Sequence, residues 1–203
     1  MIESRPTTII DACVLCSPLK RSLILSLAQA DFFCVRWSDE ILDETEKAII
    51  IILSKRGYDD AAERAAQSRL SMQQAFAEAS VVNYEDHGKE IRKLPDEGDR
   101  HIIAAAIKSR ADIIVTENLK DFPRKVLAKY GIEAKSSDEF VAAAINLSPS
   151  IAKAAIERMH HRQDWPKMSL DKLILEMEKT GLTKTVAQLN DYSTVTDFAR
   201  LRG

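Results

Sequence analysis

Acidic and amide side chains follow two stretches of this sequence that are typical of buried strands. The stretch TTII at residues 7–10 leads into Asp11, and DIIVT at residues 112–116 leads into three more such groups, Glu117, Asn118 and Asp121. Short runs of β-branched residues favour strands. In an open parallel sheet, ligands bind beyond the carboxyl ends of the strands. If these two strands are neighbours, their terminal polar groups meet at one edge of the sheet.

A further acidic group precedes a predicted helix over residues 98–109. The segment LPDEGDRHIIAAA, residues 94–106, places three acids at its start, Asp96, Glu97 and Asp99. Carboxylates brought together repel one another unless a cation neutralises them, and the hard cations Mg²⁺ and Mn²⁺ take oxygen ligands. Such a site can bind a phosphodiester and activate water. The alternative interpretation is structural, with Asp99 capping its helix and Asn118 and Asp121 shaping a turn.

The surrounding sequence alternates strand-like and helix-like segments. The first strand lies within 7–15 and is expected to end at Asp11; further strands are predicted at 32–37, 80–84, 112–116 and 132–135. Helices are predicted from Pro18 to Ala30, from an N-cap at Ser38 to about Ser54, at 59–79, 98–109 and 123–129, and from Ser136 or Ser137 onward. This alternation predicts a parallel sheet with helices on both faces, which is a three-layer α/β/α sandwich.

The stretch NLSPS at residues 146–150 is predicted to be a linker between a main domain, 1–146, and a small all-α extension, 147–203. Apolar stripes predict three helices in the extension, near residues 151–159, 170–177 and 182–189, with Gly181 as a C-cap. Residues 193–202 could instead be the reading helix of a helix–turn–helix. Because that stretch offers few residues for base contacts, a helical cap that packs on the main domain or contacts a partner is favoured.

Composition narrows the class of protein. The 203 residues include 29 Lys and Arg against 31 Asp and Glu, and the net charge of −2 gives the whole chain no electrostatic footprint for nucleic acid. No apolar run is long enough to span a bilayer, and no signal peptide is recognised. A soluble, cytoplasmic protein without membrane contact is expected. Its cysteines are expected to be reduced thiols, namely Cys13, Cys16 and Cys34.

Three segments together resemble the PIN domain of VapC-type toxins from bacterial toxin–antitoxin pairs. They are TTIIDACVL, WSDEILDETEKAI and LPDEGDRHIIAAAIKSRADIIVTENLKDFP, and the resemblance covers about residues 5–145. The tail from residue 148 resembles a helical extension found on some of these toxins.

The acids that the resemblance carries over as site residues are Asp11, Glu44 and Asp99. Glu40 and Asp43 are rivals of Glu44, and Glu40 lies one helical turn from Glu44 on the same face, so spacing alone cannot choose. Asp96 could assist Asp99. The fourth family position is often Asp but is Asn118 here, with Asp121 three residues later. An amide oxygen adds no negative charge, so activity with one metal ion is expected rather than with two.

The resemblance implies Mg²⁺-dependent hydrolysis of RNA, with Mn²⁺ as a possible substitute, by a homodimer that a cognate antitoxin silences. Asp11 and Asp99 would ligate the metal, Glu44 would position the attacking water, and Asn118 and Asp121 would complete the shell, Asp121 as a further metal ligand. The groups expected to contact the substrate are Thr116, Arg100 and Lys120. Thr116 could hydrogen-bond either Asp11 or a phosphate, and the two cations could meet RNA phosphates.

Two other functions are alternatives to the nuclease. A PIN fold that has lost catalysis and binds RNA or a partner is supported by Asn118 alone. A phosphate-transfer enzyme built around Asp11 is disfavoured, because Cys13 stands where a second Asp would be needed. The C-x-x-C pattern at 13–16 is interpreted as core packing rather than a redox or zinc site. The histidines are also interpreted without a metal: His101 packs or caps, and His160 and His161 are a solvated pair.

Overall fold

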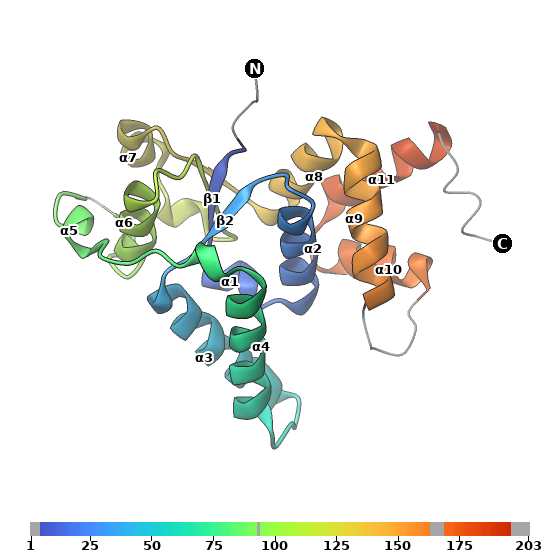
Figure 1. The fold of residues 1–203 in the computed structure, drawn as a ribbon, viewed down its shortest axis with the longest axis horizontal. Coiled ribbons are helices and arrows are strands. Elements are labelled where there is room, and N and C mark those ends of the chain that lie inside the picture. Colours follow the sequence, from blue (N-terminus) through green and yellow to red (C-terminus); the bar gives the residue numbers. More distant parts are fainter. Residues whose placement is uncertain (1–4, 93, 163–168, 196–203) are drawn as a thin grey trace. The chain divides into compact units, whose positions relative to one another are not determined.

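Residues 5–92, 94–162 and 169–195 are described by the structure, a computed structural model of the chain. These residues form two compact units (Figure 1). The first holds the described residues up to Arg21 together with Phe33–Ser136. The second holds Ser22–Phe32 together with the described residues from Ser137 onward. Helix α2 (Pro18–Gln29) therefore contributes residues to both units.

A four-stranded parallel sheet lies in the first unit. Its strands follow the spatial order β2-β1-β3-β4, with bounds β1 (Thr7–Ile10), β2 (Cys34–Arg36), β3 (Ile113–Val115) and β4 (Glu133–Lys135). Ile10 pairs with Val115, and the backbone N–H of Asp11 donates to the carbonyl of Val115 at 3.0 Å. The first strand and the strand at 112–116 are neighbours, which is the condition on which a shared site depended, and the two strands end at the same edge of the sheet.

The inner strands are buried almost throughout. In β1, Thr8, Ile9 and Ile10 are buried, and in β3, Ile114 and Val115 are fully buried. A strand in the middle of a parallel sheet can bury every residue, because both of its faces are covered. Helix α6 (Arg100–Lys108) packs against β1 and β3. It carries a run of buried residues, Ile102, Ile103, Ala104, Ala105 and Ala106.

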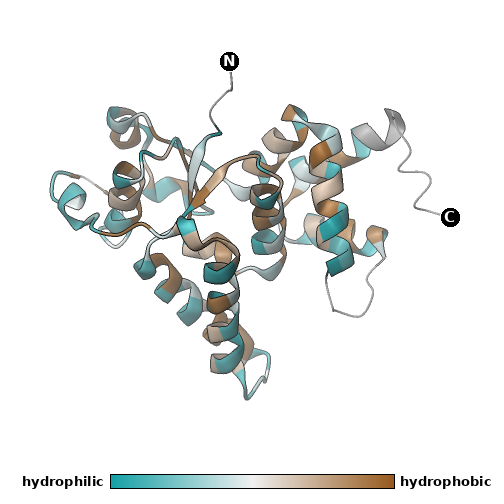
Figure 2. Cartoon of the chain, viewed as in Figure 1, coloured by the Kyte–Doolittle hydropathy of each residue, from teal (hydrophilic) through white to brown (hydrophobic). Residues whose placement is uncertain are grey.

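Helices α3 (Asp39–Lys55) and α4 (Ala61–Ala75) pack against each other as a helical hairpin. The predicted N-cap of α3 is confirmed, since Ser38 Oγ accepts from the N–H of Ile41 at 3.2 Å. Teal and brown segments alternate along both helices in Figure 2, as they do in amphipathic helices. One cation of α4, Arg69, forms ion pairs with three acids of α3, Asp39, Asp43 and Glu46.

The predicted helix over 59–79 is shorter than expected. Helix α4 ends at Ala75 because the backbone of Phe76 leaves the helical region, at φ −138° and ψ 62°. The Phe76 ring then packs edge-on against Trp37, with 5.9 Å between ring centroids. The remaining short elements of this unit are α1 (Ala12–Leu15), η1 (Ala77–Ala79), α5 (Glu85–Gly88), η2 (Leu119–Asp121), α7 (Arg124–Leu127) and η3 (Ala128–Tyr130).

The predicted strand at residues 80–84 is wrong. Only a single parallel bridge forms there, between Ser80 and Trp37. The chain turns away directly afterwards, because Val82 is exposed and Asn83 adopts a positive φ of 56°. The stretch SVVNY, which favoured a strand, therefore forms too few paired residues to build one. The short helix α5 follows directly after residue 84.

The second unit consists of helices, including the part of α2 from Ser22. The others are α8 (Ser137–Leu147), α9 (Pro149–Arg162), α10 (Leu170–Lys179) and α11 (Thr183–Val195). The three helices predicted beyond residue 150 are confirmed as α9, α10 and α11. Gly181 joins the last two at φ 86°, in the left-handed conformation expected of a C-cap glycine.

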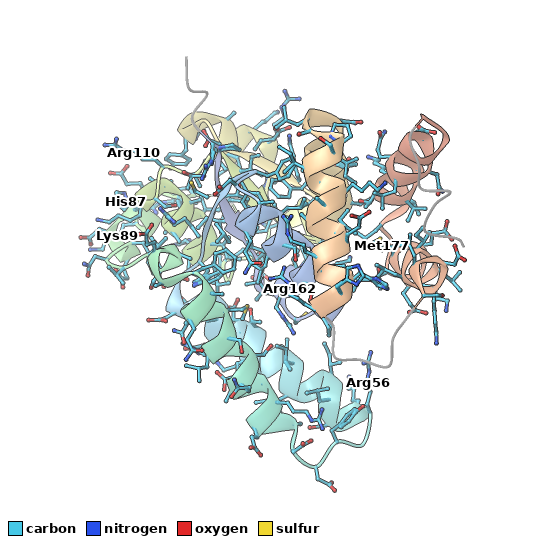
Figure 3. All side chains as sticks on the ribbon, turned by 45° about the vertical axis from the view of Figure 1, so that its right-hand side comes forward. Arg56, His87, Lys89, Arg110, Arg162 and Met177 are labelled. Carbon is cyan, nitrogen blue, oxygen red and sulfur yellow. The ribbon has the colours of Figure 1, made fainter. Side chains whose placement is uncertain are left out.

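Polar contacts tie these helices together. Asp138 of α8 accepts backbone N–H groups from the first turn of α11, from Lys184 at 2.9 Å and Thr185 at 2.8 Å. Arg162 lies at the end of α9 (Figure 3), and its guanidinium donates to Gln29 Oε1 of α2 at 2.9 Å. Met177 is fully buried on α10.

The fold class is confirmed: an α/β protein with a parallel sheet, followed by C-terminal helices. The two compact units divide at Ser136 and Ser137 rather than at residue 146. Residues 146–150, predicted to be a linker, hold the end of α8 and the start of α9, because Pro149 occupies a helix-starting position. The possible reading helix at 193–202 lies largely outside the described residues. Within the described ranges, no helix has the length and apolar character needed to cross a membrane.

Candidate active site

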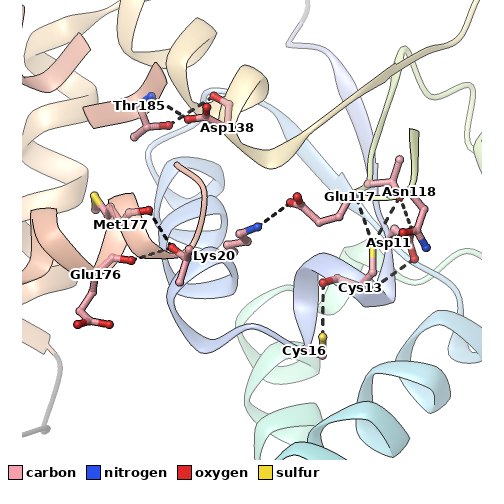
Figure 4. A network of polar contacts seen from close by, with 12 residues as sticks. Asp11, Cys13, Cys16, Lys20, Glu117, Asn118, Asp138, Glu176, Met177 and Thr185 are labelled. Carbon is pink, nitrogen blue, oxygen red and sulfur yellow. Dashed lines mark hydrogen bonds and ion pairs between the residues drawn. The ribbon is translucent and has the colours of Figure 1, made fainter. Parts of the chain in front are cut away.

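Asp11 lies at the carboxyl end of β1 and caps helix α1. Only 5% of its surface is exposed. Its Oδ2 accepts from the Thr116 hydroxyl at 2.6 Å and from the Cys13 thiol at 3.0 Å, and its Oδ1 accepts from the N–H of Cys13 at 3.4 Å (Figure 4). Of the two contacts predicted for Thr116, the structure has the hydrogen bond to Asp11. This carboxylate is held by three donors.

Asp99 stands at the first position before α6. Its side chain makes no hydrogen bond to the N-terminus of that helix, so the capping interpretation does not describe it. Burial, and then the negative charges of Asp11, Asp96 and Asp121, raise the pKa of Asp99 from 3.8 to about 6. These four carboxylates therefore share one electrostatic environment. Asp96 also shapes a turn, since its Oδ1 accepts from the N–H of Gly98 at 2.8 Å.

Glu44 and Glu40 flank the ring of His101. The distance from Nε2 to Glu44 Oε1 is 3.2 Å, and the distance from Nδ1 to Glu40 Oε2 is 3.6 Å. Only 9% of the His101 side chain is exposed, and neither ring nitrogen has a partner with hydrogen-bond geometry in the described part of the chain. Burial lowers the pKa of His101, but the carboxylates of Glu44 and Glu40 outweigh it and raise the pKa. Glu40 also accepts from the Tyr84 hydroxyl at 3.2 Å.

Two of the acids near the predicted site are engaged elsewhere. Asp43, a rival of Glu44, forms an ion pair with Arg69 of α4. Glu117 extends to Lys20, with 3.1 Å between Oε1 and Nζ (Figure 4). The helix-borne acids that remain beside His101 are Glu40 and Glu44.

The turn after β3 carries the remaining predicted residues. The backbone N–H of Asn118 donates to Thr116 Oγ1 at 3.0 Å, and the backbone N–H of Asp121 donates to the Asn118 carbonyl at 2.9 Å. Asn118 and Lys120 are exposed, whereas Asp121 is half-buried. Arg100 forms an ion pair with Glu97.

A hollow of about 450 Å³ adjoins Glu40 and His101. Its lining carries both signs of charge, with cations at Lys89 and Arg100 and carboxylates at Glu40, Glu85 and Glu97. The hollow therefore offers hydrogen-bond donors and acceptors together, close to the acids of the site.

The chemistry of the donors suits a hard divalent cation. The carboxylates around Asp99 and the amide of Asn118 offer oxygen atoms, which Mg²⁺ and Mn²⁺ prefer. The raised pKa of Asp99 reflects its burial first and then the neighbouring negative charges. Among residues 5–92, 94–162 and 169–195, no three His, Cys, Asp or Glu side chains already lie close enough to enclose an ion. Mutual repulsion opposes such an approach until a cation is present.

Two residues beside these acids were misjudged from the sequence. His101 was expected only to pack or cap, yet it contacts both candidate glutamates. Cys13 was expected to fill the core, yet its thiol contacts Asp11. The signal for Cys13 was its position two residues after a capping Asp, in the first turn of α1, where side chain and backbone can both reach the carboxylate.

A parallel α/β fold with uncompensated carboxylates at the carboxyl edge of its central strands defines the class of this protein. Residues 7–120, more than half of the chain, match the family model of the PIN domain. The chain belongs to the PIN-domain family. Residues 137–191 match the model of the VapC50 C-terminal domain.

One curated relative is "Putative ribonuclease VapC50" from Mycobacterium tuberculosis (strain ATCC 25618 / H37Rv). The two sequences are 45% identical over 58 residues, which is 29% of this chain and 34% of that protein. The chain thus matches about a third of the length of this relative. No solved structure matches the chain.

Proposed function

We propose that this protein is a metal-dependent endoribonuclease of the VapC type, the toxin of a type II toxin–antitoxin pair. The observation that carries this proposal is the environment of Asp99, whose pKa rises to about 6 beside Asp11, Asp96 and Asp121. Acids with a strongly perturbed pKa at the ligand-binding edge of a sheet are candidates for a functional site. Membership of the PIN-domain family and the name of the curated relative support the same activity.

Asp11, Asp99 and Asp121 would hold the cation, Mg²⁺ or Mn²⁺, with Asn118 adding a neutral oxygen. When bound, this cation would lower the pKa of a water molecule and neutralise charge on the phosphodiester. Thr116 and Cys13 orient Asp11 through the hydrogen bonds described above.

Glu44 is proposed to position the attacking water. Its Oε1 lies 3.2 Å from Nε2 of His101, and Glu40 lies 3.6 Å from the other ring nitrogen. Glu44 is the nearer of the two, and its side chain is less exposed, 43% against 54%. Asp43 is a weaker candidate because Arg69 already neutralises it.

Arg100 and Lys120 are proposed to bind phosphates of single-stranded or loop RNA on either side of the scissile bond. Lys120 is exposed and accessible to a phosphate. Arg100 would exchange its contact with Glu97 for one to RNA. Phosphate contacts of this kind set affinity and register, whereas the hollow beside His101 offers groups that could contact a base.

A homodimer and silencing by a cognate antitoxin in the cytoplasm complete the proposal. These features rest on membership of the family rather than on any surface of the described residues. Sedimentation of the purified chain tests the dimer, and rescue of growth by the co-expressed antitoxin tests the pairing.

The decisive experiment is cleavage of total RNA by purified protein with Mg²⁺, Mn²⁺ or EDTA, beside Asp11→Asn and Asp99→Asn. Asp60→Asn is the matched control, because Asp60 is an exposed acid at the start of α4. Discrete fragments that require metal, vanish in both site variants and persist in the control are expected.

Intact RNA under every metal condition, with folded protein free of antitoxin, would refute the nuclease. Retained RNA binding in that case would favour a catalytically weakened PIN fold that acts as an RNA- or partner-binding module. The observation in favour of this second candidate is Asn118, which adds no charge to the site.

A further inference from the structure

Two side chains connect the ends of β1 and β3 in the same way. Each donates a hydrogen bond to Asp11 Oδ2, and each accepts a backbone N–H from the turn after β3 (Figure 4). The two backbone groups belong to consecutive residues, Glu117 and Asn118. We call this pair of side chains, Thr116 and Cys13, the clasp.

The Thr116 half of the clasp comes from β3 itself. Its hydroxyl donates to Asp11 Oδ2 at 2.6 Å and accepts from the N–H of Asn118 at 3.0 Å. The Thr116 side chain is fully buried, so both hydrogen bonds are shielded from water.

The Cys13 half comes from the first turn of α1. Its thiol donates to Asp11 Oδ2 at 3.0 Å and its sulfur accepts from the N–H of Glu117 at 3.2 Å. The sulfur also lies 3.5 Å from Thr116 Oγ1. The next residues, Val14 and Leu15, are the ones that enter the core, since neither is exposed at all, whereas Cys13 is half-buried. Cys13 therefore faces the site and does not serve only as a small core residue.

The clasp gives the two oxygens of Asp11 different hydrogen bonds. Oδ2 takes two side-chain donors, whereas Oδ1 takes one backbone N–H at 3.4 Å, which is long for a hydrogen bond. A carboxylate held at one oxygen presents the other oxygen in a fixed direction. Partners of this kind around a metal ligand set its orientation and affinity.

We propose that Cys13 is a positioning residue that, with Thr116, fixes Asp11 so that Oδ1 is the oxygen offered to a divalent cation, and fixes the turn that carries Asn118. This inference rests on the proposed function for the identity of the ligand. The clasp itself rests only on the contacts within the chain.

The test compares Cys13→Ala, which removes both hydrogen bonds, with Cys13→Ser, which keeps a donor and an acceptor. Cys16→Ala is the matched control, because Cys16 is a free thiol one turn later whose sulfur donates to the Cys13 carbonyl at 3.4 Å and not to Asp11. If Cys13→Ala does not fold, Cys13→Val replaces it, since Val fills the space without a hydrogen bond.

Two measurements distinguish the variants: amide hydrogen exchange and Mn²⁺ binding. Amide hydrogen exchange at Glu117 should become about fivefold faster in Cys13→Ala, as expected for one lost hydrogen bond, while the amide of Asn118 changes little. Mn²⁺ binding, followed by the electron paramagnetic resonance of free Mn²⁺, should weaken roughly tenfold in Cys13→Ala. Cys13→Ser should restore both properties to within about threefold, and Cys16→Ala should leave both unchanged.

Equal losses in Cys13→Ser and Cys13→Ala would overturn the proposal, because a packing role is not rescued by a hydroxyl. Unchanged exchange at Glu117 in Cys13→Ala would also overturn it. If wild-type protein binds Mn²⁺ but leaves RNA intact, the proposed nuclease activity is refuted, but the positioning role of Cys13 is not. Weakened Mn²⁺ binding in Cys13→Ala alone would then still support the positioning role.

Discussion

Neutralising Asp99 should make the protein more stable when no divalent cation is present. The carboxyl of Asp99 lies among three other acids, and its side chain caps no helix. Asp99→Asn keeps the shape of the side chain and removes the charge. The substitution therefore relieves repulsion without creating a cavity.

The expected size of the effect follows from the pKa of Asp99. The folded state raises this pKa from 3.8 to about 6, and each pKa unit corresponds to about 1.4 kcal/mol. The full difference would be about 3 kcal/mol, and solvent screening of this partly exposed group reduces it to roughly 1.5 kcal/mol. At pH 7 the ionised carboxylate costs this free energy in the folded protein, and Asp99→Asn should recover it.

The sign of the pH dependence is opposite to that of a carboxylate in a salt bridge. Because the folded pKa is raised, the cost is fully present above about pH 6, falls as pH drops from 6 toward 3.8, and is absent below that. The advantage of Asp99→Asn over wild type should therefore be about half as large at pH 5 as at pH 7.

Urea denaturation in EDTA at pH 7 and pH 5 measures both expectations. Repeating it with Mn²⁺ should reverse the order, because a ligand that binds only the folded state stabilises it by about 2.7 kcal/mol at one hundred times its dissociation constant. Asp99→Asn should gain much less from the cation than wild type does.

Asp60→Asn is the control for a general effect of removing an acid. Asp60 is exposed and bonded to Arg64, and that hydrogen bond lowers its pKa. Loss of the Asp60 carboxylate should leave the free energy of unfolding unchanged or slightly lower. If Asp99→Asn is less stable than wild type at pH 7 without cations, the Asp99 carboxylate stabilises the folded protein. The expectation that its charge destabilises the fold would then be wrong.

Three further substitutions test other parts of the structure. Asp138→Ala should lower the free energy of unfolding by about 2 kcal/mol in urea denaturation, because it removes the cap of α11. Glu139→Ala is the control: its side chain forms an exposed ion pair, and its loss should cost less than about 0.5 kcal/mol. Glu44→Gln should slow RNA cleavage by roughly 100-fold, and Glu46→Gln, whose carboxylate pairs with Arg69, by less than about twofold. Asn118→Asp should tighten Mn²⁺ binding roughly tenfold in a titration and destabilise the cation-free protein, and looser binding would contradict the assignment of this turn to the site.

The sequence was sufficient to predict β1 and β3 as strands of a parallel sheet, whereas their adjacency stayed a condition. Both are short β-branched runs that end in polar residues, and such runs occur in the middle of a parallel sheet. The register between Ile10 and Val115 was not readable, because it depends on how α6 packs on both strands. That register decides that Thr116, rather than Glu117, reaches Asp11.

The choice among acids on α3 shows why spacing alone was insufficient. Glu40, Asp43 and Glu44 all lie near the start of one helix. Arg69, on the neighbouring helix, removes Asp43 from the candidates, and His101, on α6, contacts the other two. Both contacts join residues far apart in the chain, so neither leaves a periodic signal in the sequence.

Several acids of the first unit form ion pairs with a basic side chain. Asp39, Asp43 and Glu46 share the single cation Arg69, Glu117 pairs with Lys20, and Glu97 pairs with Arg100. For Asp11, Asp99 and Asp121, no Lys or Arg of the described segments lies within ion-pair distance. These three acids would also repel the phosphodiester of RNA, which carries the same sign of charge. A nuclease that uses these acids therefore needs a cation to bind its substrate as well as to cleave it. The three carboxylates without a Lys or Arg partner are the groups that would bind that cation.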